Sequence, residues 1–362
     1  MSDLSSFNNI PLLSGQLCLC GVAILWGSYS PVVRYIYSCS GPPTPAALTA
    51  VRTVIQAFVL LVSDVIVRRQ QYGSPAKAKT RRPIGGLASS SPTFSRRQEA
   101  LPSSSNNILN TISSALHSTS SKLWIAGAEL GFWNFCGSTF QALGLQYTTA
   151  TRGAFLIQAT SLLTPVMATL AGEKTSRGVW LGCCCTLTGT VLITLDHSAS
   201  AVSDHGSPAA ASSLGGDSFI LAAAFFYSVV TIRLGGYARR FAPVRLAASK
   251  SIALAIIAVG WLSSIAVLDA IGGKSTDYWS GWDNPAVLLA VLWSALGPGA
   301  LVAFLQSQGQ AVVPSAQSQV IYSTVPLWSA LLAFKFMPEE TMGAIGYAGG
   351  AVVILAGVLA TR

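Results

Sequence analysis

The chain contains a long series of apolar stretches, and this series is the feature that most limits how it can fold. A helix that crosses a membrane needs about 20 mostly apolar residues. A single helix satisfies its own backbone hydrogen bonds, so each such stretch is expected to be helical. Ten stretches meet or approach the required length. They lie at 15–37, 45–67, 123–146, 150–172, 178–195, 218–238, 246–268, 285–307, 315–336 and 343–361.

Charged residues are scarce in the same sequence. They make up 10% of the 362 residues, while apolar residues make up 51%. Soluble domains carry about 25% charged residues, so a water-soluble globular protein is excluded. An intrinsically disordered chain is excluded as well, because its apolar content would be far lower. The sequence therefore predicts an all-α polytopic membrane protein with ten transmembrane helices.

The positions of the Lys and Arg residues predict an orientation. If residues 1–14 form a cytoplasmic N-terminus, the loops on that side hold 15 Lys and Arg residues, whereas the opposite loops hold only Arg152 and Lys274. Cytoplasmic loops of membrane proteins carry such an excess. Both termini are therefore expected in the cytoplasm. Plasma membrane, plastid envelope and endomembranes all stay open as locations.

One polar segment, residues 68–122, separates the second apolar stretch from the third. It is rich in Ser and Pro and holds nine basic residues and a single acid, Glu99. We interpret it as a disordered cytoplasmic loop. Anionic lipid headgroups are a candidate partner for its Arg pairs. Because this segment carries nearly all of the net charge of +9, the basic character of the chain does not indicate a nucleic-acid partner.

The two halves of the chain repeat each other. Arg52 follows Pro45 by seven residues, and Lys250 follows Pro243 by the same spacing. An odd number of spans in each half predicts an inverted 5+5 repeat, the arrangement that supports alternating access in transporters. The first repeat combines the spans of 15–67 and 123–195, and the second covers 218–361. Glycines with matching spacing occur near the end of each half, where they favour close packing of the fifth and tenth spans. They are Gly178, Gly182, Gly189, Gly346, Gly350 and Gly357.

No catalytic or metal-binding pattern stands out in the sequence. The seven cysteines include no C-x-x-C pair and are interpreted as small apolar helix residues. The three histidines lie in Ser-rich or loop segments without ligand spacing. We therefore expect neither an enzyme nor a metal or other cofactor.

Several stretches make the sequence similar to a known family. They are AILWGSYSPVVR, PAALTAVR, ALGLQYTTATRGAFLIQATSLLTPVMATLAGEK, WLGCCCTLTGTVLI, and QSQVIYSTVPLWSALLAFKFMPEE with the closing GGAVVILAGV. The chain resembles the EamA family of the drug/metabolite transporter superfamily. This resemblance implies ten helices in an inverted 5+5 bundle around a central substrate cavity. It also implies transport of amino acids, metabolites, hormones or drugs without ATP.

Ionisable groups inside a span are costly and are candidate functional residues. Arg52, Lys250 and Glu129 are such groups. For the two basic residues, a structural role in reaching lipid headgroups or pairing with a carboxylate is an open alternative. Glu129 has three readings, which are proton coupling, binding of an amine, and an ion pair with a basic residue. Asn134, Gln158 and Tyr322 are uncharged candidates for lining a substrate cavity, with bridging between helices as the alternative.

These observations favour a secondary carrier of a small organic solute, whose oligomeric state the sequence leaves open. A phosphate-bearing solute is less favoured, because the late spans contain few basic residues. The alternative function is a non-transporting membrane scaffold or receptor that acts through the basic segment 68–122.

Overall fold

The computed structural model describes residues 12–73, 104–147, 156–201, 214–274, 276–279, 283–336 and 344–361, and all regular structure in these ranges is helical. Helical residues lie in every one of the ten predicted apolar stretches, which confirms an all-helical fold in the described ranges. The α-helices are α1 (Leu12–Ser38), α2 (Pro45–Gly73), α3 (Ser104–Tyr147), α5 (Thr160–Leu170), α6 (Arg177–Ala201), α7 (Leu214–Ala238), α8 (Pro243–Ile271), α9 (Pro285–Ala295), α10 (Val302–Gln310), α11 (Ser315–Tyr322), α12 (Val325–Phe336) and α13 (Ala344–Thr361). The π-helix η3 (Leu296–Leu301) joins α9 to α10.

Five of the described helical runs are long and apolar enough to cross a membrane. They are Leu12–Tyr37, Pro45–Gln70, Gly215–Ala238, Pro243–Ile271 and Pro285–Gln310. The first four belong to α1, α2, α7 and α8, and the fifth runs continuously through α9, η3 and α10. Their length and composition indicate a membrane protein.

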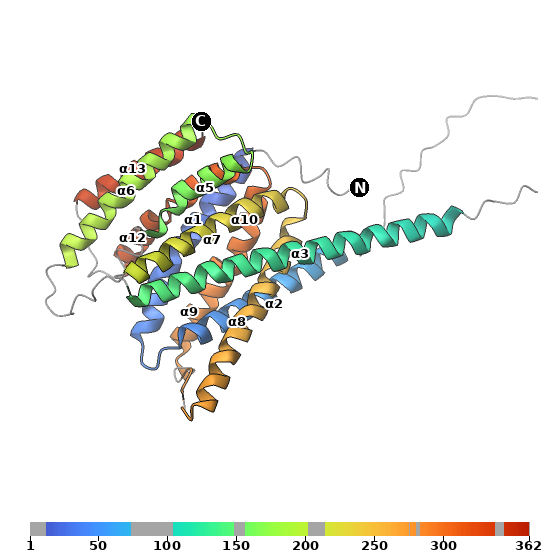
Figure 1. Ribbon diagram of the computed structural model, residues 1–362, viewed down its shortest axis with the longest axis horizontal. Coiled ribbons are helices and arrows are strands. Elements are labelled where there is room, and N and C mark those ends of the chain that lie inside the picture. The colour runs from blue at the N-terminus through green and yellow to red at the C-terminus, as the bar shows by residue number, and fades with distance from the viewer. Residues whose placement is uncertain are drawn as a thin grey trace, which may run out of the picture.

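The predicted loop 68–122 needs correction at both ends. The helix α2 continues to Gly73, and α3 already begins at Ser104, so only residues 74–103 of the segment lie outside the described residues. At the end of α2, Arg68 pairs with Asp64 one turn earlier, a spacing that supports helix. The first part of α3 projects beyond the bundle (Figure 1). A helix satisfies its backbone inside or outside the membrane, so the end of the apolar pattern did not mark the end of the helix.

Three of the apolar stretches contain interruptions. The eighth stays helical through Gly297-Pro298-Gly299, which form part of η3. A π-helix is a rare form that occurs mostly as a single turn within an α-helix, frequently at functional sites. In the fourth, Pro165 lies inside α5 and the helix is interrupted earlier, by a turn at Gln158–Ala159. The ninth is split into α11 and α12 by a turn at 323–324, just before Pro326.

The helices α6 and α13 lie side by side (Figure 1). A Cβ added at Gly178 would lie 2.6 Å from the carbonyl oxygen of Leu359. One added at Gly189 would lie 2.6 Å from Cγ2 of Val353 and 2.7 Å from the carbonyl oxygen of Gly349. The predicted close packing of these two segments through glycine is thus confirmed at Gly178 and Gly189, whereas a Cβ added at Gly350 would lie 2.6 Å from Cδ1 of Leu327 on α12.

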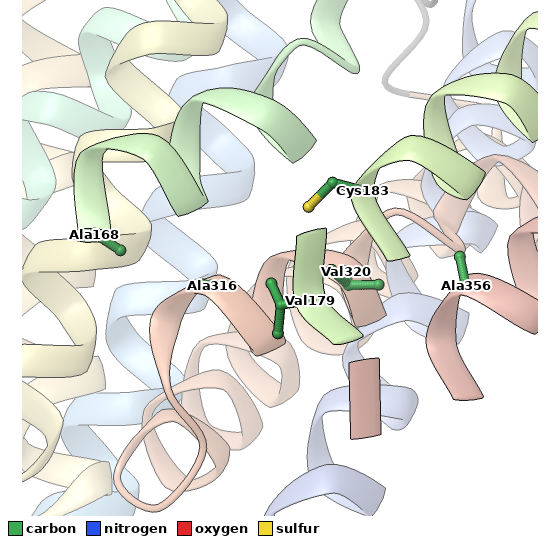
Figure 2. Close-up of a cluster of buried hydrophobic side chains, with 6 residues drawn as sticks. All are labelled: Ala168, Val179, Cys183, Ala316, Val320 and Ala356. Carbon is green, nitrogen blue, oxygen red and sulfur yellow. The ribbon is translucent and has the colours of Figure 1, made fainter. Parts of the chain in front are cut away.

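A cluster of small apolar side chains joins this helix pair to α5 and α11 (Figure 2). It consists of Ala168, Val179, Cys183, Ala316, Val320 and Ala356. Cys183 is fully buried in the cluster and acts as a small apolar residue, as predicted.

Two further apolar clusters lie at other helix crossings. The first brings together α1, α2, α9 and the segment before α9 through Ile36, Leu48, Trp279, Val287 and Val291. The second brings together α3, α7 and α8 through Leu123, Ala126, Leu130, Leu234, Ala238 and Leu246. The helices α2 and α8 also contact each other directly.

Candidate functional site

Four polar side chains are buried together where α8, α10 and α11 meet. They are Lys250, Gln306, Gln310 and Tyr322, and we call them the Lys250 cluster. Their exposed fractions are 4%, 3%, 0% and 5%, respectively. A bundle of this apolar composition gains nothing by burying polar groups without partners, so the cluster is the first place to look for function.

Lys250 lies two turns into α8, which begins at Pro243. Its Nζ donates a hydrogen bond to Oε1 of Gln306 over 3.2 Å. An ammonium group has three N–H donors, and a buried charge normally has an ionic partner. None of the ion pairs among the described residues includes Lys250. Among the described residues, its hydrogen-bond acceptor is the amide oxygen of Gln306.

The remaining two members of the cluster have incomplete hydrogen bonding. The hydroxyl of Tyr322 lies near the amides of Gln306 and Gln310, but within the described chain it meets the geometry of a hydrogen bond with neither. Both side-chain amide atoms of Gln310 also have no partner there. The ring of Tyr322 packs edge-on against Trp26, with the centroids 5.2 Å apart. Buried polar groups in native proteins are nearly always satisfied, so these three atoms need an explanation.

Arg52 lies on α2, the helix that packs against α8. Its guanidinium sits 5.0 Å from the ring centroid of Tyr29, which is a cation–π contact. Its Nε is buried and has no hydrogen-bond partner in the described part of the chain. One turn further along α2, Gln56 donates a hydrogen bond of 2.8 Å to Oγ of Ser251, the residue after Lys250. The two basic residues thus flank one contact between α2 and α8.

Glu129 forms an ion pair, which confirms one of its three predicted readings. Arg233 on α7 donates from Nη2 to Oε2 of Glu129 over 2.8 Å, and the hydroxyl of Tyr237 donates to the same carboxylate. The guanidinium also lies 5.2 Å from the centroid of the Tyr237 ring. Because Arg233 already neutralises this carboxylate, Glu129 is less suited to bind an amine.

Asn134 and Gln158 occupy other parts of the bundle. Asn134 is half-buried on α3. Gln158 is buried in the turn before α5, where its backbone carbonyl accepts a hydrogen bond from Oγ of Ser161. Nearby, Nε2 of Gln319 donates to Oγ1 of Thr160 over 3.0 Å and links α11 to α5. Of the six predicted site residues, the structure brings Lys250 and Tyr322 into one cluster, and Arg52 lies on the helix α2 that packs against α8.

Sequence reasoning missed Gln310 and did not assign Gln306 to the site. A usable signal was present in the sequence, because these residues are four positions apart in a helix and so share one face. Two polar amides on one face of an apolar helix predict a common partner. What the spacing does not give is the identity of that partner.

Comparisons with known proteins establish the fold alone. No protein-family model matches the chain, and no curated protein matches it. One solved structure, described only as "Crystal structure of protein", is similar with a TM-score of 0.65 and covers 96% of each chain. The two sequences are 16% identical, so the likeness concerns the architecture and not the activity.

Proposed function

We propose that the protein is a secondary carrier that moves a small organic solute across a membrane by alternating access. The observation that carries this proposal is the Lys250 cluster, a closed set of buried polar groups with unpaired atoms inside an apolar helical bundle. In a carrier, such groups are completed by the solute and are closed off between two open states. We further propose an inverted 5+5 repeat of the EamA type, with both termini in the cytoplasm.

The register of the two halves supports the proposed repeat. Ile36 lies nine residues before Pro45, and Leu48 lies three residues after it. Leu234 and Leu246 have the same positions relative to Pro243. Each pair belongs to one apolar cluster that joins the two helices to a third. The same core contact thus occurs once in each half.

The pattern of helix contacts supports the repeat as well. If the halves are exchanged, α1 corresponds to α7, α2 to α8, α6 to α13, and α5 to the α11–α12 pair. The contact of α1 with α12 then has its counterpart in that of α7 with α5, and the contact of α5 with α6 in that of α11 with α13. The pairs α2–α8, α6–α13 and α5–α11 map onto themselves. A two-fold relation between the halves gives this pattern directly.

Polar contacts between the halves are suited to open and close in a carrier. Glu129 binds Arg233, and Glu173 accepts from Nη2 of Arg239 over 3.4 Å and from Oγ of Ser315 over 3.2 Å. The two arginines have side chains that are 50% and 48% exposed, so these contacts are weak enough to break during a transport cycle.

Transport by the purified protein in liposomes tests this function. A panel of labelled amino acids, organic acids, nucleosides and amines is offered in the absence of ATP, with protein-free liposomes as the control. Saturable uptake of at least one class of solute is expected. Absence of flux for every class, with helical content retained by circular dichroism, would count against a carrier.

A further inference from the structure

We propose that the Lys250 cluster is an anion site and that the carried solute is a small carboxylate with an otherwise uncharged body. This inference rests on the proposed carrier function and adds the chemical class of its substrate.

The charge balance of the interior is the first argument. The ion pairs of the described chain join Arg68 to Asp64, Arg233 to Glu129 and Arg239 to Glu173. Lys250 and Arg52 take part in none of them. A lysine retained for structural reasons would be expected to have a carboxylate beside it, because an uncompensated buried charge is strongly destabilising. In the part of the chain that the structure describes, Lys250 is thus a buried cation without an ionic partner, and an anionic solute would balance its charge.

The hydrogen-bonding groups of the cluster give the second argument. Lys250 uses one of its three N–H donors on Gln306. The Nε2 of Gln310 and the hydroxyl of Tyr322 are further buried donors, and Oε1 of Gln310 is a buried acceptor. None of these three atoms forms a hydrogen bond of standard geometry among the described residues. A carboxylate has two oxygens that accept about four hydrogen bonds, which fits this surplus of donors. An amine would bring more donors and a second positive charge next to Lys250.

A carboxylate fits the cluster better than a phosphate does. The cluster contains one cation, and the guanidinium of Arg52 is engaged with the Tyr29 ring. Phosphate groups are typically held by several basic residues or by bidentate arginine. Tyr322 also belongs to an apolar cluster with Leu19, Val22, Val302, Val313 and Ile321. These surroundings disfavour a second charge on the solute.

Binding of matched probes to the purified full-length protein tests the inference. Hexanoate and benzoate are compared with their amides, hexanamide and benzamide, and with their amines, hexylamine and benzylamine. The thermal unfolding midpoint is measured against the concentration of each probe, because a ligand of the folded state raises it. The carboxylates are expected to stabilise the protein at concentrations at least about tenfold lower than the amides or amines. Inorganic phosphate is included and is expected to bind more weakly than benzoate.

Variants of the cluster link this preference to the named residues. Lys250→Met is expected to weaken carboxylate binding by about tenfold or more, because it removes a charge-assisted hydrogen bond. Lys274→Met makes the same change at an exposed position and is expected to leave binding unchanged. Tyr322→Phe keeps the ring, removes one donor and is expected to weaken binding several-fold. If Lys250→Met does not fold, the Tyr322→Phe variant decides.

Two results would overturn the anion site. One is equal or better binding of the amides, amines or phosphate than of the carboxylates, or no binding of either carboxylate. The other is an unchanged affinity for carboxylates in the folded Lys250→Met variant. If Lys250→Met does not fold, an unchanged affinity in Tyr322→Phe has the same meaning. Saturable uptake of neutral or cationic solutes would leave the carrier function intact in both cases. Absence of uptake for all solutes would instead refute the carrier function itself.

Discussion

Lys250 and Gln306 join α8 to α10 through a single buried hydrogen bond, 3.2 Å from Nζ to Oε1. The ammonium group has no carboxylate partner within the described chain, so this amide oxygen is its main local compensation. The pair combines a structural contact with a charge that a solute can use.

Gln306→Leu removes the acceptor and leaves the ammonium of Lys250 buried without it. The free energy of unfolding is expected to fall by about 1–3 kcal/mol, the cost of an unsatisfied buried group. Gln308→Leu, at a half-buried position on the same helix, serves as the control and is expected to have a much smaller effect. Thermal unfolding in detergent measures both. Equal shifts for the two variants would show that the Lys250 contact contributes nothing specific.

Gln306→Glu places a carboxylate next to Lys250 inside the protein. The new side chain is expected to form an ion pair with the ammonium and to compete with an anionic solute for it. Uptake of carboxylates should therefore fall by about tenfold or more, while the protein stays folded. Normal carboxylate uptake in this variant would contradict a direct role for Lys250 in binding.

Gly189→Ala introduces a methyl group between α6 and α13. The added Cβ would lie 2.7 Å from the carbonyl oxygen of Gly349, a backbone atom that cannot move aside without shifting the helix. A loss of about 1–3 kcal/mol is expected from this overpacking. Gly236→Ala is the matched control, because a Cβ there meets nothing within 4 Å. A smaller loss at Gly189 than at Gly236 would show that the two helices are not packed through this glycine.

The contact between Glu129 and Arg233 is expected to couple the two residues only modestly. The free energy of unfolding is measured for the intact chain, Glu129→Gln, Arg233→Gln and the double variant. Because the Arg233 side chain is 50% exposed, the coupling free energy from this double-mutant cycle should be about 1 kcal/mol or less. The exchanged pair, Glu129→Arg with Arg233→Glu, should recover part of the uptake that either single change removes. No recovery, together with zero coupling in the cycle, would exclude this pair as a contact that opens and closes.

The basic segment gives a test that separates a carrier from a scaffold. Deletion of residues 76–101 removes chain outside the described helices and leaves α2 and α3 in place. Uptake by the purified protein is expected to stay within about twofold of that of the intact chain, because the free-energy cost of chain closure changes only slowly with the length of a connecting segment. A loss of flux in the folded deletion variant would favour a function that depends on the segment.

The helices could be predicted from the sequence because apolar run length is a local property. The packing of α6 on α13 was also predictable, since Gly178 and Gly189 are small residues of the kind that lets two helices approach closely. The composition of the Lys250 cluster was not, because Lys250 and Gln306 are 56 residues apart and meet only through the crossing of α8 and α10. Helix ends such as Ser104 also escaped prediction, since polar residues can continue a helix beyond the membrane.

Counterflow tests directly whether the protein is a carrier with alternating access. Liposomes containing the purified protein are loaded with an unlabelled solute found to be transported, and a trace of the labelled solute is added outside. A carrier with alternating access is expected to accumulate the label transiently above its equilibrium level without ATP, because outward movement of the unlabelled solute drives exchange. Uptake that rises only to equilibrium and is not accelerated by internal solute would contradict the account.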